Sequence, residues 1–275
     1  MKNTNISFII PAYNCAKFLP DAINSIFNGN FTADDEAIIV DDASTDNTFK
    51  VAQSLQKKHP QIEIYRHHYN KGSAAAGRNT GIDNSKNELI FCLDADNVLC
   101  PNSIPKLKEY TLDKKADVAA FGELHFFKNK IQNVTHKWIY KGEITLNDVI
   151  NNTKIAPCAS GNYLFTKTSW LRAGRYNESP SIVVLDSWAF GFCQLAIGAK
   201  MITLANTFYY HRYGYNSTYV KEIKKNNPSL AALQVIIPYL HLIDEKDIEY
   251  IMSDRNRYSW FENTNNHPIK FKKHL

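Results

Sequence analysis

The 275-residue chain has 44% hydrophobic and 21% charged residues, an ordinary globular composition that excludes a disordered protein. Its net charge of +5, from 32 basic and 27 acidic residues, is too small a bias to indicate nucleic-acid binding. The five cysteines form no CxxC pair, so we expect reduced thiols and a cytoplasmic protein. We expect no transmembrane segment, because no apolar stretch is long enough.

The first third of the chain alternates between strand-like and helix-like segments. Apolar, β-branched runs predict strands at residues 6–10, 37–40, 62–65 and 89–93. Apolar residues at helical spacing predict helices at 18–27, 47–58 and 72–83. This β-α order predicts a largely parallel sheet flanked by helices on both faces, with ligands bound at the carboxyl ends of the strands.

The remaining segments extend the same α/β domain. Strands are expected at 118–127, up to residue 165, and at 201–210, with a hairpin after the turn at 128–130. Helices are expected at 103–112, 145–150, 167–173, 185–197 and 230–243, the last despite Pro238. We therefore predict one domain over residues 1–220 and a small C-terminal helical extension over residues 221–275.

Two carboxylates follow the fourth expected strand, in Leu93-Asp94-Ala95-Asp96-Asn97. In an extended backbone, residues two positions apart point to the same side, so Asp94 and Asp96 can present oxygens to one point. Paired carboxylates suit Mg²⁺ or Mn²⁺ held on a substrate's phosphates. The alternative is a strand followed by an acidic turn with no ligand.

Other polar side chains fall at the same edge of the predicted sheet. Tyr13 follows the first strand, and Asp41 and Asp42 follow the second. Because parallel strands end at one edge, these residues are expected to lie near Asp94. This shared location favours a binding site over separate strand-end turns.

Five segments in this order carry a resemblance: residues 10–14, 40–46, 70–81, 93–97 and 174–186. Together they resemble the family 2 glycosyltransferases with the GT-A fold, over about the first 220 residues. The resemblance implies a nucleotide-sugar donor, usually a UDP-sugar, a divalent metal (Mn²⁺ or Mg²⁺), and inversion at the sugar carbon. The absence of a GxGxxG motif gives no support to a dinucleotide cofactor.

The chemistry of individual residues agrees with a nucleotide-sugar donor. Tyr13 would stack on the nucleobase, Asp41 or Asp42 would bind the base or ribose, and Arg78 would meet a diphosphate oxygen. The small residues from Gly72 onward would let a helix lie close to the sheet or the sugar. The candidate donor-site residues are Pro11, Ala12, Tyr13, Asn14, Asp41, Asp42, Gly72, Arg78, Asp94, Ala95 and Asp96.

The metal ligands and the catalytic base are assigned by the resemblance. Asp96 is the expected metal ligand, Asp94 a ligand or a sugar contact, and His211 a further candidate for the metal or diphosphate. Asp186 matches the family's base, which accepts a proton from the acceptor hydroxyl. Asp186 is also a good helix N-cap residue, and Glu178 is the alternative base.

The sequence does not decide which acceptor the protein uses, and it leaves two other functional classes open. The acceptor could be a saccharide, a lipid-linked or a protein hydroxyl, and Trp188 could stack on an acceptor sugar or lie in the core. The sequence leaves peripheral membrane contact and the oligomeric state undecided. Two other functions remain: a non-catalytic nucleotide-sugar binder on the same fold, and a haloacid dehalogenase-type phosphatase, whose DxD motif should follow the first strand.

Overall fold

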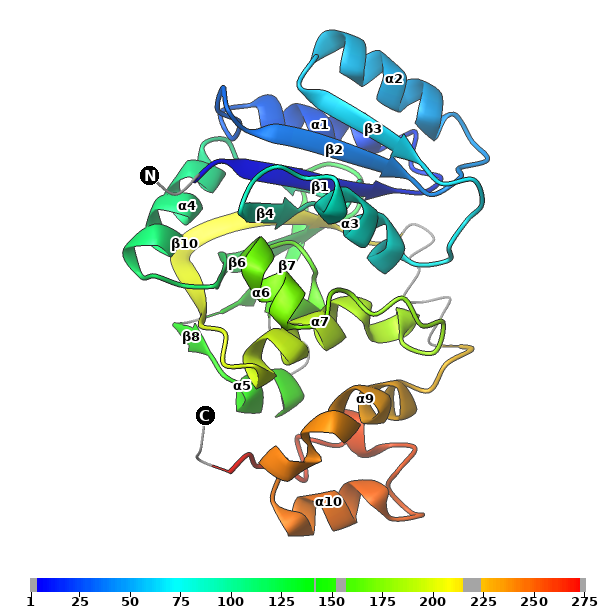
Figure 1. Ribbon diagram of the computed structural model, residues 1–275, viewed down its shortest axis with the longest axis vertical. Coiled ribbons are helices and arrows are strands. Elements are labelled where there is room, and N and C mark those ends of the chain that lie inside the picture. The colour runs from blue at the N-terminus through cyan, green and yellow to red at the C-terminus, as the bar shows by residue number, and fades with distance from the viewer. Residues whose placement is uncertain (1–3, 141, 152–156, 215–223, 273–275) are drawn as a thin grey trace.

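The computed structural model describes residues 4–140, 142–151, 157–214 and 224–272 (Figure 1). In this part of the chain, ten strands form one sheet. The main path has the order β3-β2-β1-β4-β9-β6-β10-β5, with β7 paired to β6 and β8 paired to β10. The expected α/β architecture is confirmed, with helices on both faces of a central sheet.

The first half of the sheet is built as the sequence predicts. Strands β1 to β4 alternate with helices, and the pairs β2–β3, β1–β2 and β1–β4 are all parallel. The apolar side chains of β1, β2 and β4 are almost entirely buried, which is why these strands read as continuous hydrophobic runs, whereas the edge strand β3 is only partly buried and alternates. The elements are β1 (Ile6–Ala12), α1 (Leu19–Phe27), β2 (Glu36–Asp41), α2 (Thr48–Lys58), β3 (Ile62–Arg66), α3 (Ala74–Asp83) and β4 (Leu89–Cys92).

The second half of the sheet is mixed rather than parallel. Strand β9 lies antiparallel between β4 and β6, and the expected hairpin is formed by β6 and β7. Strands β6 and β10 are parallel to each other. The elements are β5 (Val98–Leu99), α4 (Ser103–Asp113), β6 (Val118–Phe127), β7 (Val134–Ile139), β8 (Glu143–Ile144), α5 (Leu146–Asn151), β9 (Leu164–Thr166), α6 (Lys167–Arg172), α7 (Asp186–Ala196) and β10 (Met201–Arg212).

Helix α3 lies unusually close to the sheet. A Cβ atom at Gly81 would come within 2.5 Å of Ile9 Cγ2, and one at Gly77 within 3.0 Å of Pro11 Cβ. Small residues in this segment therefore serve helix-to-sheet packing. The close approach also brings the side chain of Arg78, on the same helix, to the carboxyl edge of the sheet.

The C-terminal region differs from the expected single helix at 230–243. Helix α9 (Pro228–Ile236) ends at Ile236, and a 3-10 helix over Ile237–Leu242 follows. Pro238 has no N–H to donate to the preceding turn and its ring crowds that turn, so an α-helix cannot run through it undisturbed. A further helix, α10 (Glu245–Met252), was not predicted. The expected domain boundary at residue 220 lies outside the described residues.

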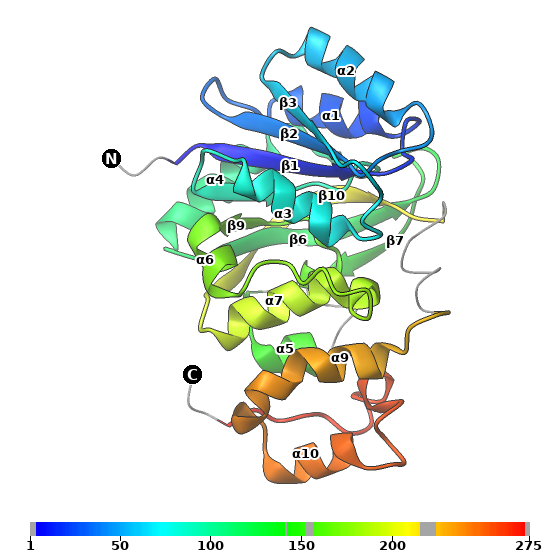
Figure 2. The same cartoon turned by 45° about the vertical axis from the view of Figure 1, so that its right-hand side comes forward.

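Helix α7 lies between the sheet and the C-terminal helices (Figure 2). Its Trp188 is 2% exposed, donates a hydrogen bond from Nε1 to the Val149 carbonyl at 2.9 Å, and packs against Phe261. Trp188 is thus a core residue, and the acceptor-stacking role considered for it is not supported. None of the described helices has the length and apolar character needed to cross a bilayer.

Candidate active site

The segment Leu93–Asn97 forms a turn held at both ends by the sheet. Strand β4 ends at Cys92, and β5 pairs antiparallel with β10 directly after the turn. The Asn97 N–H also donates to the Asp94 carbonyl at 3.0 Å, which closes the turn. Both aspartates are therefore placed at the carboxyl edge of the sheet, as the sequence predicts.

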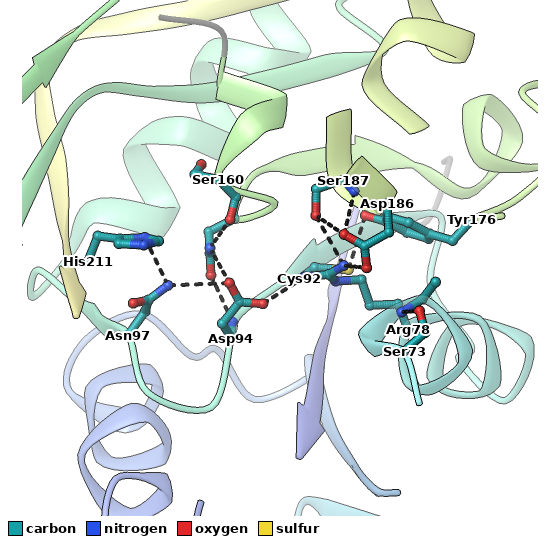
Figure 3. Close-up of polar contacts among 12 residues, drawn as sticks. Ser73, Arg78, Cys92, Asp94, Asn97, Ser160, Tyr176, Asp186, Ser187 and His211 are labelled. Carbon is teal, nitrogen blue, oxygen red and sulfur yellow. Dashed lines mark hydrogen bonds and ion pairs between the residues drawn. The ribbon is translucent and has the colours of Figure 1, made fainter. Parts of the chain in front are cut away.

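Asp94 is held by two side chains from different parts of the chain (Figure 3). Arg78 NH2 lies 2.8 Å from Asp94 Oδ1, and Asn162 Nδ2 donates to Oδ2 at 2.9 Å. Asn162 Oδ1 in turn accepts the Asp94 backbone N–H at 2.8 Å. The loop that precedes β9 therefore fixes both the backbone and the carboxylate of Asp94.

Asp96 is in a different position. No other described residue donates a hydrogen bond to its half-buried carboxylate. Burial and the nearby charge of Asp94 raise the pKa of Asp96 to about 7. A half-buried carboxylate with no donor from the protein is left to solvent or a ligand, and a divalent cation would balance its charge. The donor set of two aspartates suits Mn²⁺ or Mg²⁺ with its other ligands from water and phosphate.

His211 lies beside this turn, near the end of β10. Its Nδ1 is 3.4 Å from Asn97 Nδ2, and Asn97 Nδ2 is also 3.5 Å from Asp94 Oδ2. Burial lowers the pKa of His211, so its imidazole is neutral at pH 7, the form that binds a metal. Within the described residues, however, no three His, Cys, Asp or Glu side chains meet closely enough to hold a metal alone.

Arg212 is a positioning residue, which the sequence singled out only as part of a segment, residues 210–212, that resembles one closing over the donor in the family. Its Nε donates to the Asp96 carbonyl at 3.0 Å, and its backbone N–H donates to Asn97 Oδ1 at 2.9 Å. The guanidinium is buried between the rings of Phe18 and Phe127. That resemblance gave no sign of the contacts of Arg212 with Asp96 and Asn97.

Arg78 also reaches the candidate base. Arg78 NH1 lies 3.0 Å from Asp186 Oδ2 and 3.1 Å from Ser187 Oγ, so one guanidinium bridges Asp94 and Asp186. Burial alone would lower the pKa of Arg78, but the carboxylates of Asp186 and Asp94 raise it well above its usual value. With only 4% of its side chain exposed, Arg78 is a fixed cation between two acids.

Asp186 is the first residue of α7, and Leu185, rather than Asp186, occupies the N-cap position. Asp186 Oδ1 accepts the Ser187 backbone N–H at 2.6 Å. The N-terminus of α7 and the Arg78 guanidinium both lie against this carboxylate and fix its direction. The side chain is 16% exposed, so it remains open to a ligand.

Glu178, the alternative base, is exposed and lies on the loop before α7. Its Oε1 accepts a hydrogen bond from Asn79 Nδ2 at 2.7 Å. Asn79 also bonds the backbone of Tyr176 in both directions, so this residue of α3 organises the loop. Glu178 contacts neither Arg78 nor Asp94, which leaves Asp186 in the more central position.

The candidate nucleotide-binding residues follow β1 and β2. Tyr13 is 49% exposed and available for stacking. Asn14 has a positive φ of 48°, and its Oδ1 accepts the backbone N–H groups of Thr45 and Asp46. Asn14 therefore ties together the loops after both strands. The side chains of Ala12 and Ala95 are buried in the core, Pro11 is half-buried, and Gly72 has a positive φ before α3.

Asp41 and Asp42 differ in accessibility. Asp41 is fully buried, with Oδ2 2.9 Å from Arg66 Nε. Asp42 Oδ1 lies 2.6 Å from His67 Nδ1 and accepts the Lys71 backbone N–H at 2.9 Å. Of the two, Asp42 lies nearer the surface, so it is the better candidate for a nucleoside contact.

Comparisons with known proteins agree with this geometry. Residues 7–170 match the model of Glycosyl transferase family 2. Glycosyltransferase GlyG of Streptococcus pneumoniae is 34% identical over 113 residues, 41% of this chain and 37% of that protein. The GalNAc(5)-diNAcBac-PP-undecaprenol beta-1,3-glucosyltransferase of Campylobacter jejuni is 30% identical over 178 residues, 63% of this chain and 55% of that protein.

A solved structure extends the likeness to nearly the whole chain. Residues 1–349 of Staphylococcus aureus TarS, in complex with UDP-GlcNAc, superpose with a TM-score of 0.65 at 15% identity. The superposition covers 93% of this chain and 75% of that one. The two curated relatives, by contrast, are matched over less than two-thirds of their length. The chain has the GT-A fold, and because the family model matches more than half of its length, it belongs to glycosyltransferase family 2.

Proposed function

We propose that this protein transfers a sugar from a nucleotide-sugar, a UDP-sugar in the first instance, to an acceptor hydroxyl with inversion. The observation that carries the proposal is the bridge of Arg78 between Asp94 and Asp186, beside the unpartnered carboxylate of Asp96. Family membership and the UDP-GlcNAc complex of TarS support the donor class. The DxD turn follows β4 rather than β1, which disfavours the phosphatase.

The donor would lie along the carboxyl edge of the sheet. Its base would stack on Tyr13 and its ribose would approach Asp42, while the diphosphate would lie over Asp96. Asp96 would hold Mn²⁺ or Mg²⁺ together with the diphosphate and water, with Asp94 and His211 as further candidate ligands, and the ion would neutralise charge on the leaving diphosphate. Arg78 was expected to contact that diphosphate. In the structure its guanidinium instead pairs with the carboxylates of Asp94 and Asp186. The contact with the diphosphate therefore stays a prediction.

Asp186 would accept the proton of the acceptor hydroxyl. An inverting transfer requires attack from the face of the sugar opposite the leaving group, so the base must lie on that side. Arg78 and the N-terminus of α7 fix the direction of the Asp186 carboxylate. Glu178 remains the alternative base, and the acceptor is a saccharide, lipid-linked or protein hydroxyl.

The proposal is tested with a panel of nucleotide-sugars and Mn²⁺. We expect UDP to be released slowly in the absence of acceptor, and the melting temperature to rise with UDP and metal together. Release of inorganic phosphate alone would support the phosphatase. A melting shift without any turnover across the donor and acceptor panels would support a non-catalytic binder and contradict the transferase.

A further inference from the structure

A group of aromatic rings projects from the sheet beside the candidate active site. Phe126 is at its centre, with His136 stacked at 4.2 Å, Trp138 edge-on at 4.7 Å, and His211 at 4.9 Å between ring centroids. Tyr213 completes the group, 5.7 Å from His136. We call these five residues the aromatic cluster.

The aromatic cluster comes from three neighbouring strands that extend beyond the DxD turn. His136 and Trp138 lie two positions apart on β7, so they share one face of that strand. They stand opposite Phe126 and Leu124 on β6, while β10 supplies His211 and leads directly to Tyr213. Phe126 is 5% exposed, whereas His136 is exposed and Trp138 and Tyr213 are half-exposed. The rings thus form an accessible surface on a rigid base.

This surface is continuous with the candidate active site. His211 belongs to the cluster and also contacts Asn97, which in turn contacts Asp94. Figure 3 shows His211 and Asp186 on either side of Asp94. A molecule bound to the cluster would therefore extend directly into the space above Asp94 and Asp96.

The order of strands argues against a nucleotide at this surface. The nucleoside candidates follow β1 and β2, whereas the cluster is carried by β6, β7 and β10. Strands β2 and β6 are separated by β1, β4 and β9, a distance of about 19 Å at the usual strand spacing. A donor that reaches from β2 to Asp96 leaves the cluster to the other substrate.

The chemistry of the cluster suits a carbohydrate. Sugars present apolar C–H faces, which pack on aromatic rings, and hydroxyl edges, which need hydrogen-bond partners. Within the described residues, the Trp138 indole N–H and the Tyr213 hydroxyl form no hydrogen bond, and both are free for such contacts. An apolar protein or lipid partner would leave these polar edges unsatisfied.

We propose that the aromatic cluster binds the saccharide part of the acceptor, with sugar rings stacked on Trp138 and Tyr213. The proposal rests on the proposed transferase function and names the substrate class at the same site. It predicts an acceptor of at least two sugar units, one near Asp186 and one on the cluster. Trp138 is then a residue that determines acceptor specificity.

The test uses a glycan array of defined neutral oligosaccharides, without nucleotide, followed by titration of the full chain with the bound glycans. We expect Trp138→Ala to weaken their binding about tenfold or more, and Trp138→Phe to retain most of the affinity. Ile139→Ala is the matched control: Ile139 is the adjacent β7 residue, 53% exposed, on the opposite face of the strand. Tyr213→Ala provides a second variant if Trp138→Ala does not fold.

Three results would overturn the proposal: no glycan bound by the wild type, equal binding by the cluster variants, or loss of UDP binding in Trp138→Ala. The last result would assign the cluster to the donor. Because the array contains no nucleotide, its outcome is independent of UDP release. A protein that binds glycans through Trp138 but releases no UDP would disprove the transferase and keep the saccharide site.

Discussion

Arg78 and Asp186, 108 positions apart in the sequence, form a buried ion pair of 3.0 Å. The same guanidinium pairs with Asp94 at 2.8 Å, so α3, the DxD turn and α7 meet at one cation. The candidate base and the candidate sugar-binding carboxylate are thereby held in a fixed relation before any ligand arrives. Such preorganisation is what a transfer between two bound substrates requires.

Asp186→Asn should separate binding from transfer. Asparagine keeps the size of the side chain but cannot accept the proton. We expect UDP binding to be retained and transfer to fall about 100-fold or more, the range typical of losing a general base. The measurement is single-turnover transfer together with the UDP-dependent melting shift. Glu178→Gln is the control, and a normal Asp186→Asn rate with a slow Glu178→Gln would reverse the assignment.

Arg78→Ala should destabilise the fold as well as the site. It removes the cation between two largely buried acids, and unpaired buried charge costs about 3 kcal/mol. Urea denaturation measures this loss. Arg175→Ala removes the exposed pair with Asp83 and should cost about 1 kcal/mol or less. Equal midpoints for the two variants would show that Arg78 contributes no more than a surface pair.

Asp96→Ala should abolish both turnover and the rise in melting temperature that UDP and Mn²⁺ produce together. With this ligand missing, Mn²⁺ would no longer neutralise the diphosphate, and turnover should be lost. EDTA should have the same effect on the wild type and be reversed by added Mn²⁺. The readouts are UDP release and the melting shift with UDP plus Mn²⁺. Full activity in EDTA would rule out a metal-dependent mechanism.

Gly81→Ala should be destabilising although alanine favours helices. Its Cβ would lie 2.5 Å from Ile9 Cγ2, so α3 and β1 would have to separate. Overpacking of this kind typically costs about 1–3 kcal/mol. Ala74→Ser is the control, since Ala74 is the exposed first residue of α3. It should change the free energy of unfolding by about 0.5 kcal/mol or less. An unchanged unfolding midpoint for Gly81→Ala would show that the contact relaxes freely.

The cysteines should be unreactive in the folded protein. Burial raises the pKa of Cys15, Cys92 and Cys158 to about 12 and that of Cys100 to about 11. Because the thiolate is the reactive form, at pH 8 about one Cys100 thiol in a thousand is ionised, and fewer of the Cys15, Cys92 and Cys158 thiols. Labelling with a thiol reagent at pH 8 should be slow until urea is added. Rapid labelling of several native thiols would contradict this burial.

The elements that the sequence predicted well are those with strong periodicity. Strand β6 has the expected bounds, and α1, α2 and α4 are shifted by two residues or fewer, since each depends on its own apolar pattern. The helix expected over 230–243 was wrong, because the effect of Pro238 was underestimated. The two-residue strand β5 carries no periodicity, so its pairing with β10 could not be foreseen.

The sequence indicated which residues the candidate site would contain, but it did not indicate which of them would contact one another. The positions of Asp94 and Asp96 followed from a strand end, which is local information. The bridge from Arg78 to Asp186 depends on how α3 and α7 approach each other, and nothing in either segment encodes that distance. Asn162 and Arg212 were similarly hidden, because their partners Asp94 and Asp96 are far away in the sequence.

The contact of Arg212 with the Asp96 carbonyl spans 116 positions, and it has a consequence for the order of assembly. During synthesis, both aspartates leave the ribosome long before the residues that fix their turn. The β1–β4 half can pair early, but the DxD turn reaches its final form only when β10 has joined the sheet. A nascent chain should therefore form the loops after β1 and β2, which carry the candidate nucleoside contacts, before the DxD turn is fixed, so the candidate site is completed in two stages.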